Sequence, residues 1–384
     1  MVWTNKGHEF DELAEHILEA ASKKSFYIWG AGYFGDAIFS GLSDIIDIVG
    51  YIDSDTRKFS STKNGLYVCS PDVLKMLNKE DTAILVSAGW TGDIFNSLSD
   101  LGYKKNIHCF HIDEFLSILM IYKFDKVYLA NIGLFISERC TLRCEKCLGL
   151  IPYIENPRVM PLFELKKELD VAFRVIDYVS SLALNGGDAM CNPECCAMLE
   201  YIGGKYLSSK VGTVEIYTNA IIQPDEHFLN TIKKYNAYIR FTDYGDNPHQ
   251  RIADFIKLMT KYDIRYDHVR YSEWCDMGYP QESNGLKDEE DLQNHFNTCD
   301  RRSCQLISKG RFFYCSQAMG AERAAYCPII KDDYFSLLTK SLKKKEFIEF
   351  ALGYSNNGFI NYCRKCNGSY NTNNKRVAVG IQVI

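Results

Sequence analysis

The 384-residue sequence predicts an α/β protein made of three parts. Strand-like apolar runs alternate with helical segments over about the first 120 residues, and a second alternation of this kind begins near Phe124. After about Trp274 the alternation stops, and polar loops, a predicted hairpin and cysteines follow. Alternating strands and helices are typical of parallel sheets covered by helices on both faces. We therefore expect domains at residues 1–122, 123–285 and 286–384, since one core rarely serves so long a chain.

The first part is predicted to be a parallel sheet with a glycine loop after its first strand. Its strand-like runs are residues 26–30, 47–55, 82–89 and 106–113. "WGAGYFG" matches GxGxxG between a strand and a helix, and an acid ends the next strand. In a dinucleotide fold such glycines allow close approach of a pyrophosphate, and the acid binds the ribose. The run resembles the Rossmann-like domains of bacterial sugar-modifying proteins, which implies a nucleotide or nucleotide-sugar at Gly30, Gly32, Gly35 and Asp53. A structural domain without nucleotide is the alternative.

The second part is predicted to be a larger α/β unit, of the size of a partial barrel. An apolar spacing near 3.6 residues predicts an early crossover helix over residues 163–181. The strand-like runs are residues 126–137, 181–188, 211–219, 237–245 and 263–271.

Composition excludes several classes of protein. The net charge of −5 argues against a general nucleic-acid binder. No apolar stretch reaches the roughly 18–20 residues of a membrane span, and the acidic, amphipathic segment 1–16 is not typical of a secretory signal. We therefore expect a cytoplasmic protein whose 15 cysteines stay reduced. Their clustering favours metal or catalytic roles.

Three of these cysteines, Cys140, Cys144 and Cys147, occupy one loop directly after a predicted strand. A structural zinc site needs four ligands, usually as two close pairs. Three thiolates instead suit a [4Fe–4S] cluster with one iron open to another ligand. The loop would lie at the carboxyl edge of a barrel, where catalytic loops gather. A zinc knuckle with a distant fourth ligand is the alternative.

This loop and the segments after it resemble the radical S-adenosylmethionine (radical SAM) superfamily. "CTLRCEKC" has its CxxxCxxC signature, and "LNGGDAM" (184–190) resembles its glycine motif. "IYTNA" (216–220) and "IRFTDYG" (239–245) resemble its fourth-strand and fifth-strand segments. The resemblance covers roughly residues 124–275 and implies a partial (β/α)6 barrel of the TIM type. It also implies that S-adenosylmethionine contacts Lys146, Gly186, Gly187, Asp188, Thr218, Asn219 and Asp243.

Two residues depart from the pattern of this superfamily. Lys146 stands where an aromatic residue often packs against the adenine, and Asp188 is shorter than the usual glutamate. Contact with the methionyl amino group would then pass to backbone atoms of Gly186 and Gly187. Neither departure removes the cluster ligands.

The resemblance also implies a reaction. The cofactor's amino and carboxylate groups chelate the open iron, and an electron from the reduced cluster cleaves the sulfonium. The resulting 5′-deoxyadenosyl radical takes a hydrogen atom from an unactivated carbon of the substrate. A flavodoxin- or ferredoxin-type donor would supply the electron.

The last part resembles the twitch/SPASM extension of many radical SAM enzymes, which binds an auxiliary [4Fe–4S] cluster. "CQLISKGRFFYC" (304–315) predicts a hairpin that turns at Lys309–Gly310 and sets Cys304 opposite Cys315. The resemblance implies ligation by Cys315, Cys363, Cys366 and either Cys299 or Cys304, of which the hairpin favours Cys304. A zinc ribbon is the alternative, because two cysteine pairs also suit Zn²⁺.

A further cysteine and the substrate complete the hypotheses. Cys191, just after the glycine motif, is a candidate donor of a hydrogen atom to a substrate radical. A carbohydrate or nucleotide-sugar is the preferred substrate, which would be oxidised, epimerised or dehydrated. A peptide maturase is the second hypothesis, weakened by the lack of a recognisable leader-binding segment. A non-catalytic iron–sulfur and nucleotide-sensing protein is the third.

Overall fold

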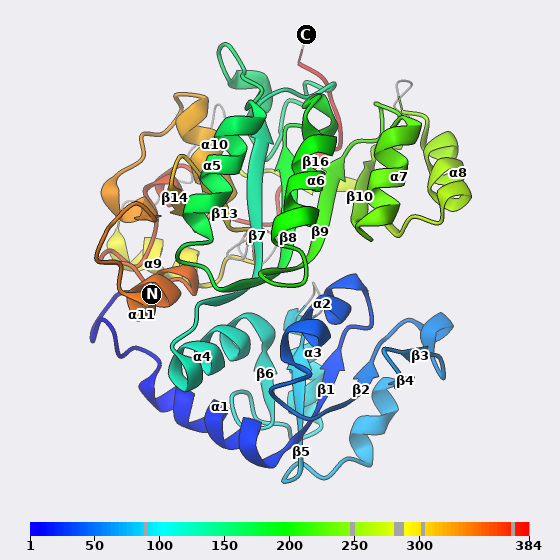
Figure 1. The fold of residues 1–384 in the computed structure, drawn as a ribbon. Coiled ribbons are helices and arrows are strands. Elements are labelled where there is room, and N and C mark those ends of the chain that lie inside the picture. The colour runs from blue at the N-terminus through cyan, green and yellow to red at the C-terminus, as the bar shows by residue number, and fades with distance from the viewer. Residues whose placement is uncertain (88–90, 246–249, 280–287, 301–303, 370–372, 384) are drawn as a thin grey trace.

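The computed structural model describes the whole chain except residues 88–90, 246–249, 280–287, 301–303, 370–372 and 384. The described residues form two large sheets and a two-stranded one, with helices packed around them (Figure 1). Most strand pairs in the two large sheets are parallel, so the predicted α/β class is confirmed. No helix in the described part of the chain is both long and apolar enough to cross a bilayer.

The first sheet has the strand order β3-β4-β2-β1-β5-β6. Its strands are β1 (Ser25–Trp29), β2 (Ile48–Ile52), β3 (Thr62–Lys63), β4 (Leu66–Cys69), β5 (Thr82–Val86) and β6 (Cys109–His111). Its helices are α1 (Asp11–Lys23), α2 (Tyr33–Leu42), α3 (Thr91–Asp100) and α4 (Ile112–Phe124). The strand order reverses between β1 and β5, where ligands of doubly wound sheets bind. The predicted strand 82–89 ends at Val86, and Ala88 and Gly89 lie outside the described residues.

The second sheet has the order β11-β10-β9-β8-β7-β13-β14-β15. Its first five strands in sequence are β7 (Tyr128–Ser137), β8 (Tyr178–Gly186), β9 (Val211–Thr218), β10 (Tyr238–Asp243) and β11 (Tyr266–Arg270). The crossover helices between them are α5 (Leu162–Ala172), α6 (Cys195–Lys205), α7 (Glu226–Lys234) and α8 (Ile252–Tyr262). Parallel neighbours in sequence order with a helix in each crossover are the pattern of a barrel segment.

The predicted helix over residues 163–181 was too long. The helix α5 ends at Ala172, and β8 begins at Tyr178. Aromatic and β-branched residues such as Tyr178 and Val179 favour a strand, and both are buried beside β7.

The last part of the chain continues the second sheet. β13 (Leu306–Ser308) pairs in parallel with β7, and β14 (Arg311–Phe313) and β15 (Tyr334–Ser336) extend it antiparallel. The predicted hairpin is confirmed, since Lys309 and Gly310 form its turn with positive φ. The remaining elements are α9 (Glu289–Asn297), α10 (Ser316–Arg323), α11 (Lys344–Ala351), and the strand pair β12 (Glu273–Cys275) and β16 (Arg376–Ala378). Short 3₁₀ helices lie at Thr56–Lys58, Pro71–Lys75, Ile151–Tyr153, Ala189–Cys191, Lys331–Asp333 and Asn361–Arg364.

The helix α2 joins the first unit to the second sheet, beneath which it lies in Figure 1. The Tyr33 hydroxyl donates a hydrogen bond of 3.0 Å to Glu215 on β9, and the Tyr33 ring stacks on Tyr238 at 4.1 Å. Burial raises the pKa of the Glu215 carboxyl, and the Tyr33 and Ser181 hydroxyls partly offset that rise. The helix that follows the glycine loop is therefore fixed to the second unit by a buried polar contact.

Candidate functional site

Three predicted ligands lie on one loop at the carboxyl edge of the second sheet. β7 ends at Ser137, and Cys140, Cys144 and Cys147 follow it. Burial raises the pKa of each thiol, that of Cys144 to about 11. The Cys147 thiol adds to the rise at Cys140 and Cys144, so the three sulfur atoms lie within electrostatic range of one another. Ionising such thiols requires a compensating positive charge, which bound metal provides.

The three loop sulfurs are not gathered as tightly as the ligands of a single ion usually are. Among the described residues, only Cys196, Glu200 and His227 bring three possible ligand atoms within 4.8 Å of one another. Thiolates at about 2.3 Å from one Zn²⁺ would stand about 3.8 Å apart by tetrahedral geometry. The three loop sulfurs do not all meet the 4.8 Å limit, and ligands that bind different irons of a cluster would not need to.

Asp188 ties the ends of neighbouring strands together beside this loop. Its carboxylate accepts hydrogen bonds from the backbone N–H of Met190 at 2.8 Å, the Thr218 hydroxyl at 2.9 Å and the backbone N–H of Asn219 at 2.8 Å. The side chain is 2% exposed. Burial raises its pKa, and the three donors partly offset that rise. The predicted residues Asp188, Thr218 and Asn219 therefore form one hydrogen-bonded group.

Asn219 extends this group to the cysteine loop. Its amide donates to the Cys140 sulfur at 3.4 Å and to the Thr141 hydroxyl at 2.9 Å. The backbone N–H of Leu142 also donates to the Cys140 sulfur at 3.4 Å. Hydrogen bonds to ligand sulfurs orient them and set cluster potentials.

The two predicted glycines lie where β8 passes closest to the loop. A Cβ atom on Gly186 would stand 2.2 Å from the Ser137 carbonyl oxygen, and one on Gly187 would stand 2.5 Å from the Arg139 carbonyl oxygen. The backbone N–H of Gly187 donates to Ser137 at 2.8 Å. These contacts explain why glycine is needed at both positions.

Asp243 lies at the end of β10 and faces β11. The His268 Nε2 atom is 3.0 Å from its carboxylate, and the backbone N–H of Gly245 donates to it at 2.8 Å. His268 stacks on Phe241 at 5.1 Å. In chain order β9 is the third and β10 the fourth strand of this unit, so the segments predicted to belong to a fourth and a fifth strand each lie one strand earlier than expected. The acid of β10 is held by its own neighbours at the same edge of the sheet.

Lys146 forms an ion pair inside the protein. Its ammonium lies 3.2 Å from the Asp276 carboxylate, with side-chain exposures of 16% and 11%, and donates to the Tyr279 carbonyl at 3.1 Å. The Tyr279 hydroxyl in turn donates to the Cys147 carbonyl. The residue that departs from the superfamily pattern therefore fastens the loop to segment 276–279.

Tyr244 is a site residue that the sequence analysis missed. Burial raises the pKa of its phenol, and the Cys144, Cys147 and Cys140 thiols raise it further. The phenol therefore lies within electrostatic range of all three predicted ligands, while its ring meets Trp274 edge-on at 5.6 Å. The sequence could have indicated this residue, because Tyr244 directly follows Asp243 at the end of a predicted strand.

Cys191 lies beside the same loop. Burial raises the pKa of its thiol to about 11, with a smaller contribution from Asp188, and the backbone N–H of Thr141 donates to its sulfur. The Cys191 thiol also contributes to the raised pKa of Cys140. Its predicted position near the barrel mouth agrees with these contacts, but its role as a hydrogen-atom donor stays a prediction.

A second set of cysteines surrounds a small cavity in the last part of the chain. The cavity has mainly apolar walls and is lined by Met277, His295, Phe296, Cys299, Tyr314, Cys315, Gln317, Ile360, Tyr362, Cys363 and Cys366. Burial raises the pKa of the Cys363 thiol, and the thiols of Cys366, Cys315 and Cys299 raise it further. Four cysteines thus face one another.

Cys304 does not line this cavity. Its carbonyl accepts a hydrogen bond of 2.9 Å from the backbone N–H of Ser316, as expected for a residue opposite Cys315 in the hairpin. Cys299, by contrast, contributes to the raised pKa of both Cys315 and Cys366.

The acid that follows β2 is hydrogen-bonded to the glycine loop of the first unit. The Asp53 carboxylate accepts hydrogen bonds from the backbone N–H of Ala31 and from the Lys58 ammonium, each at 2.8 Å. A Cβ atom on Gly35 would stand 2.0 Å from the Gly30 carbonyl oxygen, so glycine is required for helix α2 to approach β1. Gly32 directly precedes the first residue of α2.

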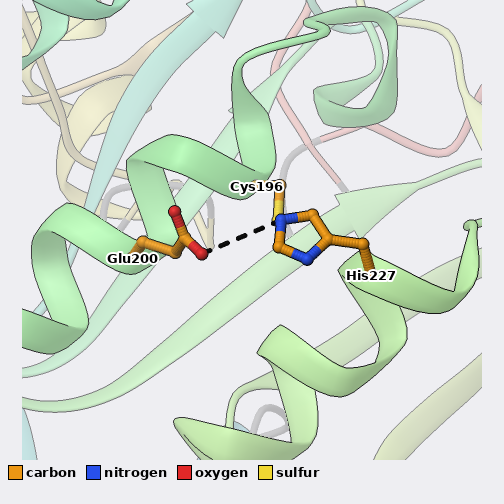
Figure 2. A group of neighbouring side chains, drawn as sticks. All are labelled: Cys196, Glu200 and His227. Atoms are coloured by element: carbon orange, nitrogen blue, oxygen red, sulfur yellow. Dashed lines mark ion pairs between the residues drawn. The ribbon is translucent and has the colours of Figure 1, made fainter.

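Figure 2 shows a separate group of possible ligands, in which Cys196 and Glu200 of α6 face His227 of α7. The His227 Nε2 and Glu200 Oε1 atoms are 3.8 Å apart, and their side chains are 72% and 45% exposed. We describe the group as a surface contact beside a half-buried thiol.

No protein family model matches the chain, and no curated protein matches it. UDP-D-quinovosamine 4-dehydrogenase from Vibrio fischeri is 23% identical, over 25% of this chain and 89% of its own, with a TM-score of 0.21. The anSMEcpe protein with bound AdoMet and Kp18Cys peptide is 12% identical, over 66% of this chain and 92% of its own, with a TM-score of 0.41. BtrN in complex with AdoMet and 2-DOIA is 12% identical, over 65% of this chain and 98% of its own, with a TM-score of 0.43. Likenesses at this level do not establish a family for the chain.

Proposed function

We propose that the chain is a radical SAM enzyme whose open-site [4Fe–4S] cluster is held by Cys140, Cys144 and Cys147. The observation that carries the proposal is that these three cysteines share one loop at the carboxyl edge of a parallel sheet, and that their sulfurs do not all lie within 4.8 Å of one another. When bound, the cluster and S-adenosylmethionine would supply reductive cleavage of the sulfonium and abstraction of a hydrogen atom from the substrate.

The surrounding residues position this site and exclude water from it. Asp188 fixes the start of the segment after β9, which in turn orients Asn219 toward the Cys140 sulfur. Tyr244 brings a phenol close to the sulfurs, and burial raises the pKa of that phenol. The ion pair of Lys146 with Asp276 holds the loop from the other side.

We further propose an auxiliary [4Fe–4S] cluster in the second cysteine cavity. Cys299, Cys315, Cys363 and Cys366 all line it and would give four protein ligands. A fully ligated cluster of this kind suits electron transfer, because no iron is left open. Cys304 is the alternative fourth ligand, supported by its place in the hairpin.

For the substrate we propose a carbohydrate or nucleotide-sugar. The support is the glycine loop before α2 with Asp53 after the next strand, the arrangement in which a pyrophosphate and a ribose are bound; Lys58 pairs with that acid. A nucleotide ribose would have to share Asp53 with Lys58. A flavodoxin- or ferredoxin-type protein is the proposed electron donor.

The test is anaerobic incubation of the reconstituted, reduced protein with S-adenosylmethionine. We expect 5′-deoxyadenosine to form and to increase when a nucleotide-sugar is added, with deuterium moving from substrate to 5′-deoxyadenosine. Stimulation by peptides alone would favour a peptide maturase. If no 5′-deoxyadenosine forms under any condition, a non-catalytic iron–sulfur protein is the better description.

A further inference from the structure

Residues 380–383 lie beside the cysteine loop, although they follow it by more than two hundred residues. The backbone N–H of Glu145 donates to the Ile381 carbonyl at 2.7 Å, and that of Val383 donates to the Arg143 carbonyl at 2.7 Å. Cys144 and Gln382 form an antiparallel bridge. The segment is anchored just before it, where β16 pairs with β12. The loop therefore gains a short strand partner from the distant end of the sequence.

The side chain of Gln382 points to a ligand sulfur in one fixed orientation. Its Oε1 atom accepts a hydrogen bond of 2.6 Å from the backbone N–H of Arg143, which can only donate. Its Nε2 atom donates to the Gly380 carbonyl at 2.6 Å, and that carbonyl can only accept. These two partners exclude the flipped amide. The same Nε2 atom lies 3.4 Å from the Cys144 sulfur and donates to it.

The contact acts on a buried group. Cys144 is 5% exposed, so its hydrogen bond with Gln382 is shielded from water. A Cβ atom on Gly380 would stand 3.3 Å from the Tyr244 side chain, so the segment also packs on Tyr244. Residues 380–383 thus cover the loop from the side of Cys144 and Tyr244.

We propose that Gln382 is a positioning residue that raises the reduction potential of the cluster held by the three-cysteine loop. The inference rests on the proposed function, since it needs a cluster at Cys144. A donor N–H stabilises negative charge on a ligand sulfur, and the reduced cluster carries one electron more than the oxidised one. The hydrogen bond therefore stabilises the reduced state more than the oxidised state.

Gln382→Leu in the full chain removes the donor and keeps a side chain of similar size. We expect its midpoint potential, followed by EPR during anaerobic redox titration, to become more negative. A tenfold smaller ratio of reduced to oxidised cluster at a given potential corresponds to about 59 mV for one electron. Gln382→Glu should shift the potential in the same direction, because its carboxylate cannot donate and adds negative charge.

Ile381→Ala is the matched control. Ile381 is 53% exposed, and its hydrogen bond with the loop is made by the backbone carbonyl, which the substitution keeps. We expect this variant to keep the wild-type potential. All variants also carry Cys363→Ser and Cys366→Ser, which remove ligands of the second set of cysteines. Iron and sulfide content and potential then report only the cluster at the three-cysteine loop.

A negative shift in both Gln382 variants, with iron content and the Ile381→Ala potential unchanged, supports the proposal. An unchanged potential in Gln382→Leu overturns it, as does an equal shift in Ile381→Ala. If the parent protein binds no iron at this loop, the proposed function fails instead, and the iron assay reports this before any titration.

Discussion

Asp188→Asn tests whether this carboxylate holds the site together. An amide can keep its oxygen toward Thr218 and Asn219, but its NH₂ group then faces the backbone N–H of Met190, 2.8 Å from the present carboxylate oxygen. One hydrogen bond to a charged acceptor is lost and two donors are brought together, a cost of about 2 kcal/mol. Relief from burying a charge lowers that cost, since burial raises the pKa of Asp188.

The assay is hydrogen exchange read by mass spectrometry on peptides that cover residues 188–191 and 218–220. A cost of about 2 kcal/mol corresponds to roughly thirtyfold more frequent local opening. Asp225→Asn is the control, because Asp225 caps α7 through the Phe228 N–H at 2.8 Å and asparagine caps helices about as well. Unchanged exchange in both peptides of Asp188→Asn would refute the reasoning.

Three further predictions concern the cysteines and a buried acid. Cys299→Ser should lower iron content by up to one cluster per chain while Cys304→Ser should leave it unchanged, as measured by iron assay; the opposite result would restore Cys304 as the ligand. Cys191→Ala should keep 5′-deoxyadenosine formation but lose incorporation of solvent deuterium into product, and unchanged incorporation would remove Cys191 as the donor. Burial raises the pKa of Asp333 from 3.8 to about 6, so its contribution to stability is present below about pH 4 and is lost as pH rises through 6, by about 3 kcal/mol. The free energy of unfolding of Asp333→Asn, taken from denaturation curves, should fall less over this pH range than that of the parent chain. An equal fall in both proteins would contradict the raised pKa.

Local patterns predicted the parts of the fold that depend on neighbouring residues. The alternation of strands and helices gave the α/β class, and Lys309–Gly310 gave the hairpin, because a two-residue turn depends on the conformation of those residues alone. The same periodicity misplaced the end of α5, since an apolar run suits a buried strand as well as a helix. The cysteine loop was recognisable because its three cysteines are close in sequence.

Contacts between distant segments had no such signal. Gln382 reaches Cys144 only because β12 and β16 bring the segment back to the loop. The ion pair of Lys146 with Asp276 likewise joins residues that are far apart in the sequence. A single sequence reports residue types and local spacing, and it is silent on which distant side chains meet in the folded chain.

The pairing of β13 with β7 has a practical consequence for dividing the protein. The backbone N–H of Gly133 donates to the Gln305 carbonyl at 2.9 Å, and Leu306 and Ile307 lie in register with Gly133 and Leu134. Cutting the chain near residue 286 would therefore expose the unpaired edge of a central, apolar strand, which is a template for aggregation. The second and third predicted domains are better expressed together, and an insoluble fragment ending there would say nothing about the chemistry of either cysteine set.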